Sequence, residues 1–391
     1  MIVAGEPSGD QLAAELVREL RVQNPELLFW GAGGPQMAAA GVELAFDLTR
    51  HSVIGLLEVL RKYGAFRRML QDLVALAVKR RPDVIIGVDY GGFNLRLGQA
   101  IRVAQKSLPD WRPRLIQFVS PQVWASRPGR AQVLSSNYDL LLSILPFEKA
   151  WYAVHAPTLR VEFIGHPLVD RYPVISPAGG QPRTPEGSPT HPLLVLLPGS
   201  RTSELRRHWP VIRDAAAQMA RELPLRVRVV LPSQELATDA QAAVQAWPAL
   251  EVRVGGLAET LREATLAIAS TGTVTLECAW FRVPTLALYR TSWSTYQIGK
   301  RIITVPYLAM PNLLAGEPVM PEFIQGKATA GNLARAGLEL LRNPERLREI
   351  RKKLGNAVAQ LGEPGAKRRA AGQVLDLLST SVTTHSYSSS R

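Results

Sequence analysis

The turn Pro198–Arg201 has the residue types that bind a phosphate group. Gly199 allows the backbone to approach a ligand closely, Ser200 carries a hydroxyl group, and Arg201 carries a guanidinium fork that can hold two oxygens of a diphosphate. A helical pattern follows, and a helix N-terminus favours anions through its unpaired N–H groups and its dipole. The same residues could form an ordinary strand-to-helix turn with a surface arginine, and the spacing alone leaves both interpretations open.

A second turn in the same half of the chain has a similar composition. It contains three hydroxyl residues and one glycine at the start of a helical pattern: Ser270, Thr271, Gly272 and Thr273. Glu277 lies one helical turn beyond Thr273, where a carboxylate could accept hydrogen bonds from both hydroxyl groups of a ribose. The alternative is an N-cap run followed by a solvated glutamate. Two such turns in one domain favour a nucleoside-diphosphate site more than either turn alone.

Acidic side chains take the corresponding positions in the first half of the chain. Glu6 and Asp10 flank a glycine-containing turn after the apolar segment Ile2–Ala4, and Asp89 follows the apolar segment Val84–Val88. A carboxylate at the end of a buried strand can act as a general base toward a hydroxyl group. The alternatives are a helix N-cap for Asp10 and a loop-capping role for Asp89, and both stay open.

The composition limits the other kinds of site. The 391 residues include 46 Lys+Arg against 33 Asp+Glu, a net charge of +13, which permits phosphorylated small molecules, anionic membranes or nucleic acids as partners. One cysteine excludes an intrachain disulfide framework and a cysteine-rich metal site. None of the six histidines is paired at a metal-ligand spacing, so we expect no metal and no cofactor. Residues 302–316 lack charged side chains but contain two prolines and are too short to cross a bilayer.

Apolar runs and helical patterns alternate along both halves of the chain, which predicts an α/β fold with parallel sheets covered by helices. The expected strands are Ile2–Ala4, Leu28–Trp30, Val84–Val88, Leu115–Val119, Leu140–Leu145, Leu193–Leu197, Arg226–Leu231, Glu251–Val254, Leu266–Ala269 and Thr285–Leu288. The proline-rich stretch 172–192 is typical of a linker. We therefore expect domains over 1–171 and 193–365, followed by a terminal helix and tail over 366–391 that is frayed from Ser379.

Residues 50–81 combine apolar side chains with eight basic and two acidic ones. Such a segment could lie on the surface of an anionic bilayer. The alternative is an ordinary helix that packs on the sheet and exposes a basic face. We expect no nucleic-acid partner, because aromatic side chains are not interleaved with the charges.

Motifs spread along residues 1–365 resemble the lipid-A-disaccharide synthase family, whose members are glycosyltransferases of the GT-B fold. The segments that carry the resemblance are 5–10 (GEPSGD), 31–34 (GAGG), 52–59 (SVIGLLEV), 82–94 (PDVIIGVDYGGFN), 120–124 (SPQVW), 163–169 (FIGHPLV), 197–205 (LPGSRTSEL), 270–277 (STGTVTLE) and 295–325. Ser126 departs from the pattern, because the family commonly has tryptophan there, and this puts the acceptor pocket in doubt. The resemblance implies two Rossmann-like domains that face a cleft, with C-terminal helices that cross back to the first domain.

The resemblance also implies a reaction. It is an inverting transfer of 2,3-diacylglucosamine from UDP to a hydroxyl group of 2,3-diacylglucosamine 1-phosphate (lipid X), with UDP as the leaving group. The implied base is Asp89, with Glu6 and Asp10 as weaker candidates. The turns Gly199–Arg201 and Ser270–Thr273 would hold the diphosphate, and Glu277 the ribose. The residues expected at the sugar and acceptor site are Ser8, Asn94, Tyr296, Gln297 and Asn312.

Both substrates of that reaction carry acyl chains, so the resemblance favours a membrane-surface role for residues 53–73. It implies a cytoplasmic protein that is peripheral to the inner membrane, and a homodimer in which C-terminal parts are exchanged. Two other functions remain as alternatives. A UDP-N-acetylglucosamine 2-epimerase would share the fold and the UDP site but has no use for a lipid-binding segment. A non-catalytic membrane-bound sensor of UDP nucleotides would bind UDP without turnover.

Overall fold

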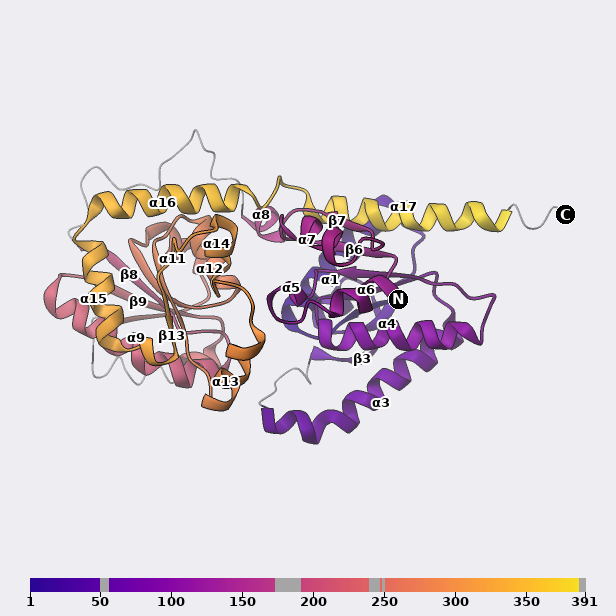
Figure 1. Ribbon diagram of the computed structural model, residues 1–391, viewed down its shortest axis with the longest axis horizontal. Helices are drawn as coiled ribbons and strands as arrows, with labels where there is room; N and C mark the ends of the chain where they lie inside the picture. Colours follow the sequence, from indigo (N-terminus) through magenta and orange to yellow (C-terminus); the bar gives the residue numbers. More distant parts are fainter. Residues whose placement is uncertain (50–55, 173–190, 239–246, 248–249, 387–391) are drawn as a thin grey trace. The chain divides into compact units, whose positions relative to one another are not determined.

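A computed structural model describes residues 1–49, 56–172, 191–238, 247 and 250–386. The chain divides into two units (Figure 1). The first unit contains Met1–Pro173 together with Leu361–Arg391, and the second contains Val174–Gln360. Most of the predicted linker, residues 173–190, lies outside the described residues.

The first unit is built on a parallel sheet of seven strands in the order β3-β2-β1-β4-β5-β6-β7. The strands are β1 (Ile2–Ala4), β2 (Trp30–Gly33), β3 (Glu43–Asp47), β4 (Val84–Val88), β5 (Arg114–Phe118), β6 (Leu140–Ser143) and β7 (Val161–Phe163). The central strands are continuous apolar runs because both of their faces are buried. The strand order reverses between β1 and β4, which is where a sheet of this kind binds its ligand.

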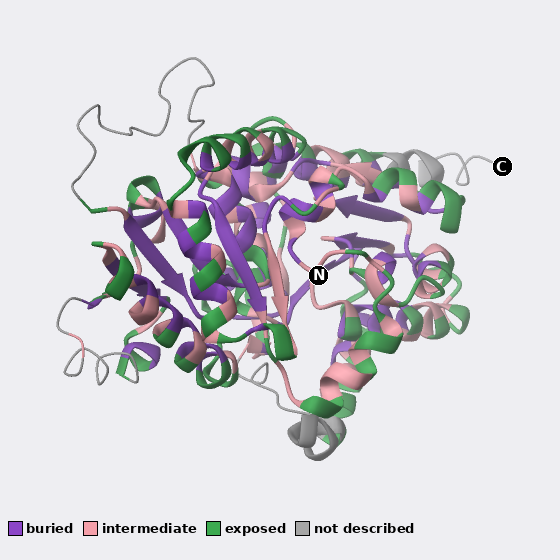
Figure 2. Ribbon diagram, turned by 60° about the vertical axis from the view of Figure 1, so that its left-hand side comes forward, coloured by how far each residue is buried: buried purple, intermediate pink, exposed green. Residues whose placement is uncertain are grey.

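Helices cover both faces of this sheet (Figure 2). They are α1 (Pro7–Gln23), α2 (Pro35–Ala39), α3 (Leu56–Arg80), α4 (Gly91–Lys106), α5 (Val123–Ser126), α6 (Arg130–Asn137), α7 (Glu148–His155), α8 (Pro167–Arg171) and α17 (Ala366–Ser386). Neighbouring residues of β4 point to opposite faces, so Ile85 packs in one apolar cluster with α3, α4, α6 and α7. Ile86 packs in the other with α1, α2 and α17.

The C-terminal helix α17 belongs to the first unit, where it packs against α1 and α8. Its side of the contact consists of small and medium apolar residues, Ala370, Ala371, Val374 and Leu377. The helix continues to Ser386, so the expectation of a tail frayed from Ser379 is wrong up to that residue. Once a packed helix has formed, each further residue adds a hydrogen bond at little cost, even through serine and threonine.

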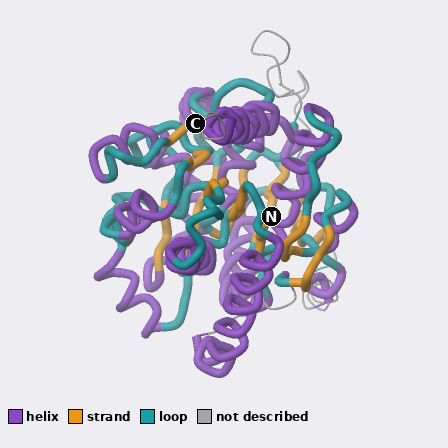
Figure 3. Tube along the Cα trace, turned by 90° about the vertical axis from the view of Figure 1, so that its right-hand side faces the viewer, coloured by secondary structure: helices purple, strands orange, loops and turns teal. Residues whose placement is uncertain are grey.

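The second unit repeats the architecture with a parallel sheet of six strands in the order β10-β9-β8-β11-β12-β13. Figure 3 distinguishes the strands from the helices by colour. The strands are β8 (Leu193–Leu197), β9 (Arg226–Leu231), β10 (Leu250–Val254), β11 (Leu266–Ser270), β12 (Thr285–Tyr289) and β13 (Glu322–Ile324). The helices are α9 (Thr202–Glu222), α11 (Leu257–Glu263), α12 (Thr273–Trp280), α13 (Trp293–Ile302), α14 (Met310–Ala315), α15 (Ala330–Leu341) and α16 (Pro344–Ala359). The prediction of two parallel-sheet α/β domains is confirmed.

Candidate active site

The carboxyl ends of β1 and β4 meet where the strand order of the first sheet reverses. Ala4 lies beside Val88 in the pairing of these strands, so the turns that follow them start side by side. An added Cβ at Gly5 would overlap the ring of Tyr90, which shows how closely the turns approach. The fold thus places the residues after both strands, among them Glu6 and Asp89, where sheets of this type bind ligands.

Asp89 lies on a left-handed turn that buried side chains hold in place. The φ angle is +49° at Asp89 and +43° at Tyr90, which is uncommon for residues other than glycine. The backbone carbonyl of Asp89 accepts hydrogen bonds from Nδ2 of Asn94 at 2.8 Å and from Nε2 of Gln117 at 2.9 Å. Both amide side chains are fully buried. Asn94 therefore holds the backbone of the turn in place. Its buried position does not favour direct contact with a substrate.

The surroundings of Asp89 strengthen its affinity for a proton. Burial raises the pKa of Asp89 and the negative charge of Glu6 raises it further, whereas a hydrogen bond from the backbone of Tyr90 lowers it. The net shift is upward, which suits a carboxylate that must take a proton from a hydroxyl group. Burial also raises the pKa of Tyr90, with a smaller contribution from Glu6.

Asp10 has a different role from the one expected of a base. It is buried, and its carboxylate accepts hydrogen bonds from the backbone N–H groups of Gly34 at 2.8 Å, Gln36 at 2.9 Å and Met37 at 3.1 Å. These groups form the N-terminus of α2, so Asp10 caps that helix across space. We do not retain Asp10 as a candidate base. Ser8 is exposed in the first turn of α1, and its contact with an acceptor stays a prediction.

A buried carboxylate after β6, which the sequence did not reveal, contacts the loop after β5. Glu148, the first residue of α7, accepts a hydrogen bond from Nε1 of Trp124 at 3.0 Å and one from the backbone N–H of Leu145 at 3.2 Å. Nearby, the hydroxyl groups of Ser120 and Tyr152 are 3.0 Å apart. Burial raises the pKa of Glu148 to about 7 against the opposing effect of these hydrogen bonds. The network fixes the Ser120–Trp124 loop, and the only sequence signal for it was a single acidic residue after an apolar run.

In the second unit, the two predicted phosphate-binding turns follow neighbouring strands. β8 and β11 pair in parallel with Leu197 beside Ala269, and the strand order reverses between them. The turn Pro198–Arg201 and the turn Ser270–Thr273 therefore start next to each other at the ligand-binding edge of this sheet. The sequence predicted each turn separately, and the fold brings them together.

The first of these turns is shaped by Gly199 and closed by an acidic residue. Gly199 has φ +126°, and an added Cβ would lie 2.6 Å from Oε2 of Glu204. The same oxygen accepts a hydrogen bond from the backbone N–H of Ser200 at 3.2 Å. The guanidinium group of Arg201 lies 3.9 Å from Oε1 of Glu204 and is largely exposed. Glu204, in the first turn of α9, thus caps the helix that the turn begins.

The second turn leaves open space above its glycine. Gly272 has φ +145°, and an added Cβ there would meet no atom within 4 Å. The hydroxyl group of Thr275 donates to the carbonyl of Gly272 at 2.7 Å, which orders the start of α12. Ser270 is buried at the end of β11, whereas Thr273 is exposed. Glu277 is half-buried one helical turn further along α12. An anion can approach the N-terminus of α12 here.

His208 joins the first turn to the neighbouring loop after β12. It is buried in α9, with Nδ1 2.8 Å from the carbonyl oxygen of Pro198. Its Nε2 lies 3.1 Å from both the backbone nitrogen and the carbonyl oxygen of Arg290. The tautomer with its proton on Nδ1 donates to Pro198 and accepts from the N–H of Arg290. His208 was not predicted from the sequence, since one histidine on a helix gives no signal of what it contacts.

The long motif 295–325 is placed around α13 and α14. Asn312 is fully buried, and its amide exchanges hydrogen bonds of 2.7 Å with the backbone of Met320 and donates to Glu322 at 2.9 Å. All of these partners are internal, so Asn312 fixes the loop before β13 and is not placed to line a sugar site. Tyr296 and Gln297 are half-buried on α13, and their contact with a sugar stays a prediction.

The described residues also bear on metal binding and on membrane crossing. No group of three or more histidine, cysteine, aspartate or glutamate side chains in those parts of the chain is arranged to hold a metal ion. None of the helices there combines the length and apolar character that crossing a bilayer requires.

The sequence profile of the lipid-A-disaccharide synthetase family matches residues 1–376. The chain belongs to this family. Lipid-A-disaccharide synthase of Geobacter sulfurreducens is 36% identical to it over 388 residues, which cover 98% of each chain. Membership makes the protein an enzyme of lipid A biosynthesis, a glycosyltransferase.

Solved structures of the same fold include both glycosyltransferases and epimerases. UDP-GlcNAc 2-epimerase from Neisseria meningitidis, bound to UDP-GlcNAc, is similar with a TM-score of 0.60 and 11% identity, covering 96% of this chain and 98% of that one. The glycotransferase of kitacinnamycin is similar with a TM-score of 0.57 and 19% identity, covering 96% and 98%. At these identities the likeness concerns the fold, and it confirms that this lipid-A-disaccharide synthase family member has the GT-B architecture.

Proposed function

We propose that the protein transfers 2,3-diacylglucosamine from UDP to the 6-hydroxyl group of 2,3-diacylglucosamine 1-phosphate in a single inverting displacement. Asp89 takes the proton of the hydroxyl group as its oxygen attacks the anomeric carbon of the donor. The bond from that carbon to the diphosphate breaks, and UDP leaves with the electron pair. Arg201 and the N–H groups of the two turns in the second unit stabilise the charge of UDP.

The observation that carries this proposal is the environment of Asp89. Its carboxylate is placed at the reversal point of the first sheet, beside Glu6, and its pKa is raised by burial. The two turns of the second unit support the UDP site by their position at the corresponding point of the second sheet. The complex of the Neisseria meningitidis epimerase with UDP-GlcNAc supports the proposal, because that protein of the same fold binds a UDP-sugar.

The test is an assay for UDP release and for the lipid disaccharide by mass spectrometry, with both lipid sugars in neutral detergent. Asp89→Asn should lower kcat by about 10²- to 10⁴-fold, the range of a positioned base, and leave UDP affinity near that of the wild type. Asp110→Asn is the matched control, because Asp110 is exposed before β5, at the opposite end of the sheet. Asp10→Asn should reduce stability more than it reduces kcat.

Three results would contradict the proposal. A wild-type protein that binds both lipid and UDP but forms no disaccharide is not a synthase. Epimerisation of UDP-N-acetylglucosamine in place of transfer would support the alternative enzyme. An Asp89→Asn variant that keeps most of its rate would remove Asp89 as the base.

We also propose that the N-terminal part of α3 and the residues before it bind the membrane surface. From Phe66 onward, apolar side chains of α3 pack on the protein core instead of facing a membrane. These are Phe66, Met69, Leu70 and Leu73, which contact the core of the first unit. Residues 53–55 and the side chains of 56–63 lie outside the described parts. Arg61→Gln with Lys62→Gln should weaken sedimentation with phosphatidylglycerol vesicles, and Lys352→Gln should not. Equal binding by both variants would contradict the proposal.

The homodimer with exchanged C-terminal parts is likewise a proposal, inherited from the family resemblance. In the single chain, α17 packs on α1 of its own unit. Light scattering of the purified protein would give the mass, and a disulfide engineered between α1 and α17 would cross-link two chains if the parts are exchanged. A monomeric mass would contradict the dimer.

A further inference from the structure

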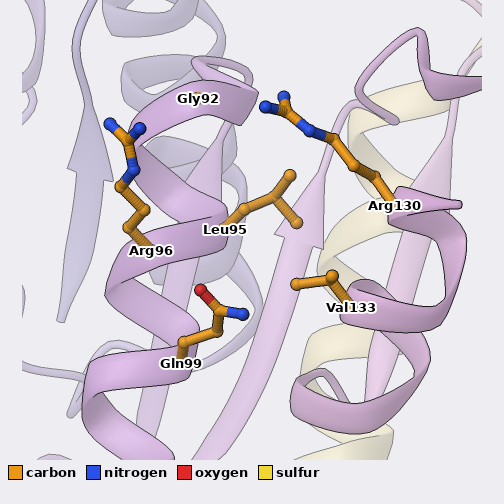
Figure 4. Close-up of a pocket in the computed structure, with 6 residues that line it drawn as sticks. All are labelled: Gly92, Leu95, Arg96, Gln99, Arg130 and Val133. Atoms are coloured by element: carbon orange, nitrogen blue, oxygen red, sulfur yellow. The ribbon is translucent and has the colours of Figure 1, made fainter. Parts of the chain in front are cut away.

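A small pocket lies on the first unit between α4 and α6, close to the turn that carries Asp89 (Figure 4). Its volume is about 130 Å³, which is enough for a phosphate group, since about 10–15 Å³ of such space holds one water molecule. The residues that line it are Gly92, Leu95, Arg96, Gln99, Arg130 and Val133. The α4 residues of this set lie on one helical face, beginning at its first turn.

The pocket concentrates positive charge without a neutralising acid. In Figure 4 the guanidinium groups of Arg96 and Arg130 lie level with Gly92, on either side of it. Burial lowers the pKa of Arg130, and the positive charges of Arg127 and Arg96 lower it further. Among the described residues, no carboxylate forms an ion pair with any of the three. Arg96 is instead placed over the ring of Phe66, 5.7 Å from its centre.

Two helices, α4 and α6, begin at or next to residues that line the pocket. An added Cβ at Gly92 or at Gly129 would meet no atom within 4 Å. Gly92 is in the first turn of α4, and Gly129 directly precedes α6. The N-terminal N–H groups of both helices therefore add partial positive charge to that of the arginines. A planar guanidinium fork suits the oxygens of a phosphate, and a phosphomonoester carries close to two negative charges at neutral pH.

We propose that the pocket of Gly92, Arg96 and Arg130 binds the phosphate group of the lipid acceptor. This inference rests on the proposed function, which supplies an acceptor with a 1-phosphate. Because α4 begins directly after the Asp89–Tyr90 turn, one acceptor sugar could reach both the pocket and the base. The pocket would then select the phosphorylated acceptor and orient its hydroxyl group toward Asp89. Phosphate groups of bilayer lipids have the same chemistry, and the experiment separates the two sources.

The experiment compares the acceptor with an otherwise identical diacylglucosamine that lacks the 1-phosphate, both in neutral detergent micelles. In the wild type, the KM of the phosphorylated acceptor should be lower by about tenfold or more, as for hydrogen bonds to a charged group. The variant Arg96→Gln with Arg130→Gln should raise the KM of the phosphorylated acceptor to that of the other lipid and leave the affinity for UDP unchanged. Lys106→Gln removes a positive charge from the far end of α4 and should behave as the wild type.

Binding of the phosphorylated acceptor without donor, measured by titration calorimetry, tests the pocket even if the wild type proves to form no disaccharide. Loss of this binding in the double variant supports the proposal whatever the fate of the reaction. Retained discrimination between the two acceptors in the double variant would overturn it. So would a double variant that loses only its binding to phosphatidylglycerol vesicles and keeps the wild-type KM in detergent, because the pocket would then serve the bilayer.

Discussion

At the scale of single residues, the conformation of Asp89 depends on buried side chains beneath its backbone. Left-handed φ angles at Asp89, Tyr90 and Val119 each cost on the order of 1–3 kcal/mol unless the surroundings enforce them. Asn94 and Gln117 supply that enforcement, since their buried amides donate to the carbonyl of Asp89, and Gln117 also donates to that of Val119 at 3.1 Å. The Asp89–Tyr90 turn is thus held by hydrogen bonds to its backbone from buried side chains.

Glu148 makes the stability of the first unit depend on pH. Its pKa rises from an ordinary 4.5 to about 7 on folding, so the neutral acid is the form that the fold favours. Stability from this group is fully present below pH 4.5 and is lost as the pH rises to about 7, with a total of about 3 kcal/mol at 1.36 kcal/mol per pH unit. Glu148→Gln should abolish this part of the pH dependence.

The measurement is the free energy of unfolding of wild type and Glu148→Gln at pH 5 and pH 8, taken at equal ionic strength. The difference between the two proteins should change by a few kcal/mol in favour of the variant at pH 8. A difference that stays constant would show that Glu148 is ionised throughout. Glu345→Gln, at an exposed glutamate in α16, is a control that should show no such change.

At the scale of elements, the turn Pro198–Arg201 is linked to α9 and to the loop after β12 through His208. α9 places the imidazole between the carbonyl of Pro198 and the backbone of Arg290, so one side chain contacts the segments after both β8 and β12. Both turns are short and irregular, so each depends on contacts with neighbouring elements for its position.

His208→Leu should therefore weaken donor binding. Without the imidazole, the Pro198 carbonyl loses its buried donor, which costs about 1–3 kcal/mol in stability. The KM of the UDP-sugar should rise by about tenfold, whereas the KM of the acceptor should change little, because the pocket proposed for the acceptor phosphate belongs to the first unit. His191→Leu, at an exposed histidine before β8, is the matched control. Equal effects on both KM values would show that His208 supports only the fold.

At the scale of the whole molecule, the first unit is formed by the N-terminal part of the chain together with the last helix, α17. α17 covers the same face of the first sheet as α1, so this core closes only when the segment 370–378 returns to it. The first unit therefore contains contacts between segments near the two ends of the sequence.

Val374→Ala tests this closure, because Val374 is buried in the contact of α17 with the cluster around α1. The truncation should reduce the free energy of unfolding by about 1–3 kcal/mol through lost burial and a residual cavity. Hydrogen exchange should show faster opening in α1 and little change in the second unit. Lys367→Ala, at an exposed position of the same helix, should shift stability by less than about 0.5 kcal/mol. Unchanged exchange in α1 would contradict the closure.

Several features of the fold could be predicted because they depend only on short segments of the sequence. The continuous apolar runs at Val84–Val88 and Leu193–Leu197 matched β4 and β8 to the residue, since a strand buried on both faces must be apolar throughout. The outer strands β3, β7 and β13 were not expected, because they are short and partly exposed and so lack that signal. Glycine and hydroxyl residues at Gly199 and Ser270–Thr273 also predicted turns.

The sequence by itself determined which segments become buried strands and which turns can approach an anion, because apolar runs and glycine act within a few residues. Only the tertiary structure decided what each polar side chain does. Asp10 proved to be satisfied by distant backbone groups, whereas Asp89 was placed beside Glu6, and His208 and Glu148 became structural links. The reason is that these partners come from strands and helices that are far apart in the chain. Their pairing follows from sheet order and register, which no local pattern contains.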